Sequence, residues 1–262
     1  KVAVIAGYLI LLIAPLIVSN SIGKGYKDSM EASESLETVI IQPNIDPYNK
    51  FQALTQDQQN AIFLSQAAKA LESRKNDSTS TPLLLLAPET FTNDIIVGQY
   101  ERSVTWRRFT SFLKDYPNVN LLFGASSYDY IRASLRPSST ARKLGNDLWL
   151  ESHNSALMTD GTGRTEIFHK SKLVVAVEKT PYPALFCRLD DLRGGVMGRC
   201  VGQEEVSLLH VRNEGVNIPI GCAVCYESVY GEYYTDYIRK GARAMAIITN
   251  DAWWGNTPGY RQ

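Results

Sequence analysis

The sequence predicts an α/β layered fold that follows a membrane-spanning helix, on the strength of three observations. From Val2 to Gly23 the chain is apolar and uncharged over a length that can cross a bilayer. Beyond this stretch, short apolar runs that end at a proline or a polar residue alternate with stretches of helical periodicity. A glycine-containing turn at 161–163 joins two of the apolar runs, as in a β-hairpin. Strands and helices that alternate in this way are typical of layered α/β proteins.

The N-terminal apolar stretch predicts a transmembrane helix over residues 1–23. A cleaved signal peptide normally has a shorter apolar core that follows an initiator Met and basic residues, whereas this chain opens on Lys1. A buried core helix is the other alternative. We therefore expect a linker over 24–37, a globular domain over 38–262, and a true start of the protein that lies upstream.

The strands and helices of the globular domain follow from the spacing of apolar residues. The first half predicts strands over 38–44, 82–90 and 119–128, and helices over 52–74 and 106–116. The second half predicts strands over 153–160, 164–170, 205–211, 216–224 and 244–251, a helix over 229–238, and a loop over 180–205.

The overall composition limits the classes of function. The 262 residues include 27 basic and 27 acidic side chains, so the net charge is zero. Nucleic-acid binding needs a clustered basic surface, and the sequence shows none, so we expect no nucleic-acid partner. Four cysteines are too few for a disulfide-built scaffold of this length.

Three polar residues stand at the ends of predicted strands. Glu89 follows a run of leucines, Lys170 closes the strand over 164–170, and Cys225 follows the strand over 216–224. Each has an ordinary structural explanation, as a solvated carboxylate, a lysine that reaches water, or a packed thiol. Each also has a chemical explanation, as a general base, a cation that stabilises an oxyanion, or a nucleophile.

The two cysteines of "GCAVCYESVYG" are expected to differ in role. Side chains alternate along a strand, so Cys222 points into the core and Cys225 is left at the turn. Ser228 is the candidate N-cap of the following helix, and a helix N-terminus would lower the pKa of the Cys225 thiol.

A metal site or a redox pair fits the cysteines less well. Cys187 and Cys200 lack a matching two-residue spacing, and the three histidines show no zinc pattern, so we expect no metal and no cofactor. A thioredoxin-like pair would stand at a helix start with its first cysteine exposed. Cys187 and Cys200 either pair as a disulfide in an oxidising compartment or stay reduced, and the sequence leaves both possibilities open.

The order Glu89, Lys170, Cys225 resembles the Glu-Lys-Cys triad of the nitrilase superfamily. The surrounding segments resemble the nitrilase-type domain of the apolipoprotein N-acyltransferase family over about residues 38–262. The matching segments are "IIQPNID", "APETF", "FHKSKLVVAVE", "CYES" and "KGARAMAIITNDAWWG", of which "TNDAWWG" is the most family-specific.

The resemblance implies an αββα sandwich on the periplasmic side of a bacterial inner membrane. It implies that Cys225 attacks the acyl ester of a phospholipid to give a thioester, while Glu89 takes the thiol proton. Lys170 and the backbone N–H of Tyr226 would stabilise the oxyanion. The α-amine of the diacylglyceryl-cysteine at the N-terminus of an apolipoprotein would then accept the acyl chain. The resemblance further implies a monomer.

The resemblance assigns other residues to the site and also shows departures from the family pattern. Glu178 and Glu227 match supporting acidic positions, and Trp253 with Asn250 lies where the family lines its active site. The departures are Lys172 in place of a histidine, "VAV" at 175–177 in place of Pro-Phe-Gly, and Ala87 in place of a frequent tryptophan.

The family pattern continues past the last residue with a helix, further strands and a final membrane helix. We therefore expect a C-terminally truncated domain within a fragment, with part of the sandwich uncovered. Two alternatives to the acyltransferase are a membrane-anchored nitrilase-family amidase, with water as acceptor, and a catalytically silent, tethered interaction domain.

Overall fold

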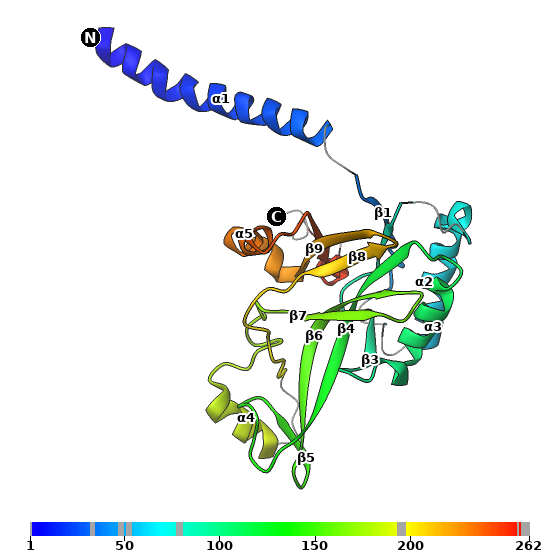
Figure 1. Ribbon diagram of the computed structural model, residues 1–262. Helices are drawn as coiled ribbons and strands as arrows, with labels where there is room; N and C mark the ends of the chain where they lie inside the picture. The colour runs from blue at the N-terminus through cyan, green and yellow to red at the C-terminus, as the bar shows by residue number, and fades with distance from the viewer. Residues whose placement is uncertain are drawn as a thin grey trace. The chain divides into compact units, whose positions relative to one another are not determined.

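The computed structural model describes residues 2–31, 35–46, 50, 54–76, 81–192, 198–255 and 257, and it divides into two compact units, Lys1–Leu36 and Glu37–Gln262. The first unit contains helix α1 (Val2–Glu31; Figure 1). Its segment Val4–Asp28 has a mean hydropathy of 2.1 and is long and apolar enough to cross a membrane. The helix continues past residue 23, where the sequence predicted a linker, so at least the first part of that linker is helical.

The second unit is built on two β-sheets. Within the described residues, the larger sheet has seven strands, in the order β1-β2-β4-β6-β5 with β3 paired to β4 and β7 paired to β6. The strands are β1 (Glu37–Ile40), β2 (Leu83–Leu86), β3 (Thr92–Ile96), β4 (Val119–Arg132), β5 (Arg142–Gly145), β6 (Leu148–Asp160) and β7 (Thr165–His169). Strand β2 runs parallel to β1 and β4, and its four leucines are all buried, as expected for a central parallel strand.

The smaller sheet has the order β10-β9-β8 in the described residues, with β8 (Leu209–Asn213), β9 (Val216–Val224) and β10 (Ala244–Ile248). Strands β9 and β10 are parallel, and helix α5 (Gly231–Arg239) connects them. The hydroxyl of Tyr237 on α5 donates to the carbonyl of Cys222, 2.6 Å away. Cys222 is fully buried, which confirms the prediction of a core thiol.

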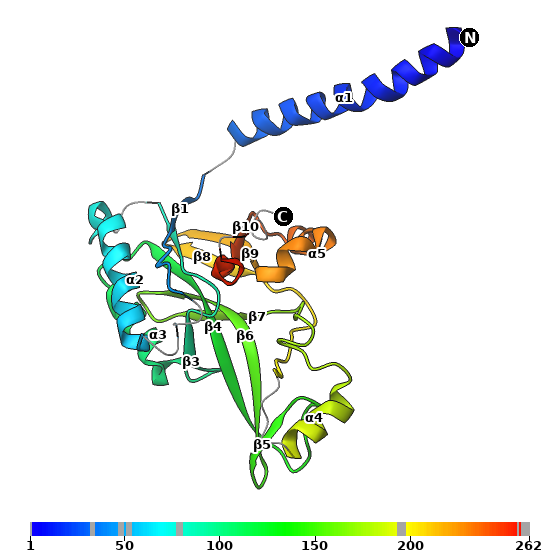
Figure 2. The same cartoon turned by 180° about the vertical axis from the view of Figure 1, so that it is seen from behind.

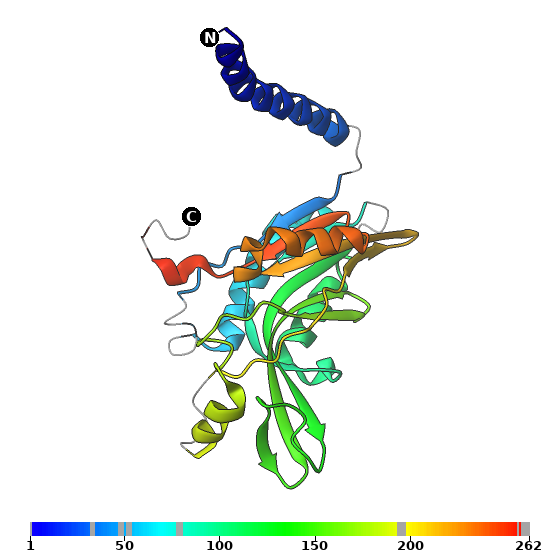
Figure 3. The same cartoon turned by 90° about the vertical axis from the view of Figure 1, so that its left-hand side faces the viewer.

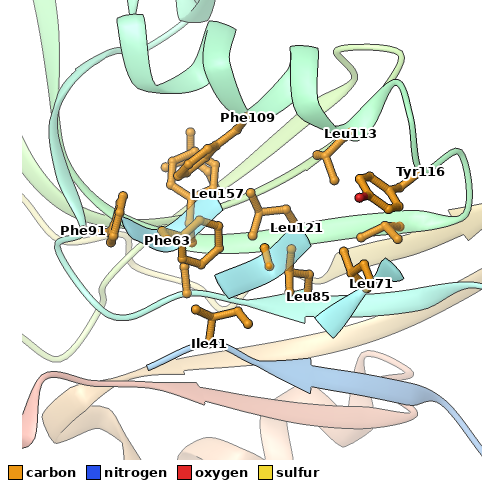
Figure 4. Close-up of a cluster of buried hydrophobic side chains, with 14 of the residues drawn as sticks. Ile41, Phe63, Leu71, Leu85, Phe91, Phe109, Leu113, Tyr116, Leu121 and Leu157 are labelled. Carbon is orange, nitrogen blue, oxygen red and sulfur yellow. The ribbon is translucent and has the colours of Figure 1, made fainter. Parts of the chain in front are cut away.

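Helices α2 (Gln56–Ala70) and α3 (Val104–Leu113) pack on the larger sheet. Figure 4 shows the core between them and the strands, in which Phe63 and Phe109 lie with ring centroids 5.2 Å apart. Both helices begin at capping residues, because the side chains of Thr55 and Ser103 accept hydrogen bonds from first-turn N–H groups. Short 3₁₀ helices occupy Glu72–Arg74, Tyr100–Arg102, Cys225–Val229 and Asp251–Trp254.

The two sheets are linked directly. The Asn120 side chain on β4 donates to the carbonyl of Arg212 on β8 (2.8 Å) and accepts from its N–H (2.9 Å). Since α2 and α3 cover one sheet and α5 packs against the other, the layers follow the predicted αββα order (Figures 2 and 3).

The predicted loop over 180–205 is wrong in part, because it contains helix α4 (Pro183–Leu192). The buried residues of α4 are Cys187 and Asp190, whereas its leucines are exposed. Arg199 holds the helix by donating to the carbonyl of Cys187 (2.9 Å) and by ion pairs with Asp190 and Asp191. Polar contacts with Arg199, not an inward apolar stripe, hold this helix. The spacing of apolar residues in the sequence therefore did not predict it.

Strands β3 and β5 were not predicted, since neither has a distinct apolar run. The sequence left open whether Cys187 and Cys200 form a disulfide, and both are free thiols in the structure.

Candidate active site

The structure brings together Glu89, Lys170 and Cys225. Glu89 follows β2, Lys170 follows β7, and Cys225 follows β9, so three strand ends from both sheets meet. The Lys170 ammonium lies 3.5 Å from Oε1 of Glu89 and 3.0 Å from Oε1 of Glu178. Glu89 and Lys170 are also the two charged groups that act most strongly on the Cys225 thiol. A carboxylate, an ammonium and a thiol therefore share one site.

Lys170 is held inside the protein by two carboxylates. Its side chain is 1% exposed, and burial of an ammonium is costly unless it is paired. Burial alone would lower the pKa of Lys170, but the Glu89 and Glu178 carboxylates outweigh it and raise the pKa. Lys170 is thus a fixed positive charge at neutral pH, not a lysine that reaches solvent.

Cys225 occupies a strained turn at the end of β9. Its φ of 51° lies in the left-handed region, which is costly for a residue other than glycine and is often found at functional sites. The prediction of a lowered thiol pKa is wrong: burial raises the pKa of Cys225, Glu89 adds to the rise, and Lys170 and a contact with the Thr249 hydroxyl oppose it. The prediction of Ser228 as N-cap is also wrong, because a 3₁₀ helix follows Cys225 and α5 begins only at Gly231, after Tyr230.

The predicted supporting residue Glu227 ties the turn of Cys225 to the segment after Lys170. Its carboxylate is fully buried and accepts from the backbone N–H of Val224 (2.8 Å), Ser171 (2.6 Å) and Lys172 (3.0 Å). The hydroxyl of Tyr233 donates a fourth hydrogen bond, 2.8 Å long. Four donors compensate the buried negative charge, and they fix Lys170 relative to Cys225.

Asn154 on β6 is a site residue that the sequence analysis missed. Its Nδ2 donates to Oε1 of Glu89 (2.8 Å) and to Oε1 of Glu178 (2.6 Å). A neutral donor between two carboxylates reduces their mutual repulsion while both face Lys170. Asn154 lies in the middle of a thirteen-residue strand, where no strand end or turn marks it.

The departures from the family pattern leave Glu178 in place. Residues 175–177 form a tight turn, in which the N–H of Glu178 donates to the carbonyl of Val174 (2.9 Å) and the N–H of Val174 donates to Oε2 of Glu178 (2.8 Å). Lys172 is exposed, with its ammonium 5.6 Å from the centre of the Tyr233 ring. Ala87 is buried in backbone contact with β4.

A cavity of about 350 Å³ lies next to the cluster. Its wall includes Pro88, which precedes Glu89, and Thr249, which contacts Cys225. The complete lining is Gln42, Pro43, Asn44, Ile45, Lys50, Pro88, Phe91, Thr249, Asn250, Asp251 and Ala252. Asn250, predicted to bind substrate, therefore faces a space large enough for part of a ligand.

Tyr226 and Trp253 are the two other predicted site residues. Tyr226 follows Cys225, and its half-exposed ring packs edge-on against Tyr230. The side chain of Trp253 lies outside the described part of the chain. In the described residues, no three His, Cys, Asp or Glu side chains are grouped so as to hold a metal ion.

Gly124 on β4 allows the backbone of Glu89 to approach. A Cβ at residue 124 would lie 2.5 Å from Cα of Glu89 and 2.6 Å from the N of Thr90. We expect Gly124→Ala to displace Glu89, to slow reaction at Cys225 more than tenfold, and to lower the free energy of unfolding by about 2 kcal/mol. Thermal unfolding and the labelling assay described below measure both effects. Gly145→Ala, which meets open space, is the matched control, and equal behaviour of the two variants would contradict the argument.

No family model matches the chain, but its sequence is similar to those of curated proteins. The chain is 22% identical over 267 residues to "Apolipoprotein N-acyltransferase" of Chlorobaculum tepidum, an alignment that covers 99% of this chain and 47% of the relative. A protein of the same name from Geobacter metallireducens is 24% identical over 253 residues, covering 95% and 42%. The chain is a homologue of apolipoprotein N-acyltransferases. It spans less than half the length of these relatives.

The comparison with solved structures supports the fold. A double mutant of the amidase from Nesterenkonia sp. AN1, a nitrilase-superfamily protein, matches with a TM-score of 0.51 and 15% identity. The match covers 86% of this chain and 68% of the amidase. The second unit therefore has the nitrilase-type fold that the sequence predicted.

Proposed function

We propose that this chain contains the catalytic domain of an N-acyltransferase that acylates apolipoproteins at a membrane. The observation that carries the proposal is the buried cluster of Glu89, Lys170 and Glu178 beside Cys225 on a strained turn. The homologues support the choice of reaction. Because the chain covers less than half of them, the activity, the substrates and the location remain part of the proposal.

In the first half-reaction, Cys225 attacks the acyl ester of a phospholipid. The raised pKa of Cys225 keeps the resting thiol protonated, so the attack requires a base, and Glu89 takes the proton as the S–C bond forms. Lys170 and the Tyr226 N–H stabilise the tetrahedral oxyanion. When the ester bond breaks, the proton on Glu89 passes to the departing lysophospholipid oxygen, and a thioester remains on Cys225.

In the second half-reaction, the α-amine of a diacylglyceryl-cysteine attacks the thioester. Glu89, again ionised, takes a proton from the attacking amine and returns it to the leaving sulfur of Cys225. Such a ping-pong cycle suits two lipid substrates, since they need not bind together. Helix α1 would hold the domain at a bacterial inner membrane, with the catalytic unit on the periplasmic side.

The test uses the full chain and an alkyne-tagged phospholipid. We expect a hydroxylamine-sensitive adduct on Cys225 that is absent in Cys225→Ala and present in Cys200→Ser, the matched thiol control. Addition of a diacylglyceryl-cysteine peptide is expected to discharge the adduct and yield N-acylated peptide.

Each other outcome supports an alternative. Release of free fatty acid in place of acylated peptide indicates a hydrolase of the amidase type. Equal labelling of Cys225→Ala, or no adduct at all, contradicts acyl transfer through this thiol and favours a silent interaction domain.

A further inference from the structure

Lys50 is a second buried lysine beside the candidate active site. The residue is 5% exposed, and its ammonium donates to the carbonyl of Thr90, the residue that follows Glu89. Its backbone carbonyl accepts a 2.6 Å hydrogen bond from the side chain of Gln59 on α2. Lys50 is therefore anchored at both ends, in a place where solvation of the charge by bulk water is lost.

The charge of Lys50 acts on Glu89. Burial lowers the pKa of Lys50 to about 8, and the Glu89 carboxylate is the group that opposes this decrease. Glu89 also faces Lys170, as described above, so two ammonium groups act on the same carboxylate. Asp251, in the wall of the same cavity, is exposed.

Lys50 also connects Glu89 with the adjacent cavity. It lines the 350 Å³ space together with Pro88 and Thr249, the neighbours of Glu89 and Cys225. Lys170 contacts Glu89 from the side of β6 and β7, where Asn154 and Glu178 lie. Lys50 thus contributes its charge from the cavity side, where a substrate would approach.

We infer that Lys50 is a positioning residue whose ammonium, held at the Thr90 carbonyl, compensates the charge of Glu89 from the cavity side and so favours removal of the Cys225 proton. The inference rests on the proposed roles of Glu89 and Cys225. Without the Lys50 charge, the negative charge of Glu89 is less compensated, and a thiolate beside it costs more free energy. Since Lys50 itself loses its proton near pH 8, its contribution is present below that pH and is lost above it.

The experiment follows alkylation of Cys225 by iodoacetamide as a function of pH, with the modified peptide quantified by mass spectrometry. In Lys50→Met we expect the alkylation rate below pH 8, where the unmodified chain carries the Lys50 charge, to fall by about tenfold, and the rate above that pH to approach that of the unmodified chain. Lys50→Arg keeps a permanent charge, so its alkylation rate below pH 8 is expected to match or exceed that of the unmodified chain. Lys69→Met, on the exposed surface of α2, is the matched control and should leave the profile unchanged.

Alkylation needs no lipid, so the result is separate from that of the phospholipid assay. An unchanged alkylation rate below pH 8 in Lys50→Met overturns the inference, and so does an equal decrease in Lys50→Met and Lys50→Arg, which would indicate a role for shape instead of charge. If Lys50→Met does not fold, as judged by thermal unfolding, Lys50→Gln is measured by the same criterion, because it retains a donor for the Thr90 carbonyl.

Discussion

Lys170→Met is expected to abolish measurable thioester formation and to destabilise the fold. The substitution removes the cation between Glu89 and Glu178, so these two largely buried carboxylates lose the ion pair that they share. Loss of one partner from a buried ion pair lowers the free energy of unfolding by about 3–5 kcal/mol. Loss of a donor to the oxyanion slows the chemical step by roughly 100-fold or more. Chemical denaturation and the labelling of Cys225 measure the two effects.

Lys172→Met is the matched control for this variant. Lys172 lies two residues away, its side chain is exposed, and its ammonium lies over the face of the Tyr233 ring. We expect it to change stability by well under about 1 kcal/mol and to keep its labelling rate. If Lys170→Met retained the labelling rate of Lys172→Met, Lys170 would have no part in stabilising the oxyanion.

Glu227→Gln is expected to have the second largest effect, although Glu227 makes no ion pair with a side chain among the described residues. The carboxylate accepts hydrogen bonds from three backbone N–H groups and one hydroxyl. A glutamine of the same size turns an NH₂ group toward at least one donor, the N–H of Val224 when the amide oxygen takes the place of Oε1, so that buried donor loses its partner. We expect the free energy of unfolding to fall by about 3 kcal/mol and labelling of Cys225 to slow at least tenfold.

The control for this variant is Glu232→Gln, which removes one negative charge at the exposed start of α5. Because the two variants have the same net charge, a difference between them reports the buried hydrogen bonds. Equal denaturation midpoints and equal labelling rates would show that Glu227 does not couple the segment of Lys170 to the turn of Cys225.

The sequence predicts much of this architecture because burial leaves a local pattern. Three patterns indicate surfaces that are buried on folding: the leucines of β2, the apolar run before Cys225, and the periodicity of α2 and α3. The same logic places Glu89, Lys170 and Cys225 at strand ends, whereas the prediction that they act together came from the resemblance to the nitrilase superfamily. Helix α4 was not predicted because ion pairs between Arg199 and two aspartates, not an apolar stripe, hold it in place.

The sequence alone therefore determines the ends of the main buried strands, the apolar helix α1, and the placement of Cys222 in the core and of Cys225 at the turn. Only the tertiary structure decides that the Cys225 thiol has a raised pKa and that Asn154 and Lys50 belong to the site. The physical reason is that both facts depend on proximity across the fold. Asn154 and Glu89 are 65 residues apart in the chain, and Lys170 and Glu89 are 81 apart. Burial and neighbouring charges set the pKa of a thiol, and they act through space rather than along the chain.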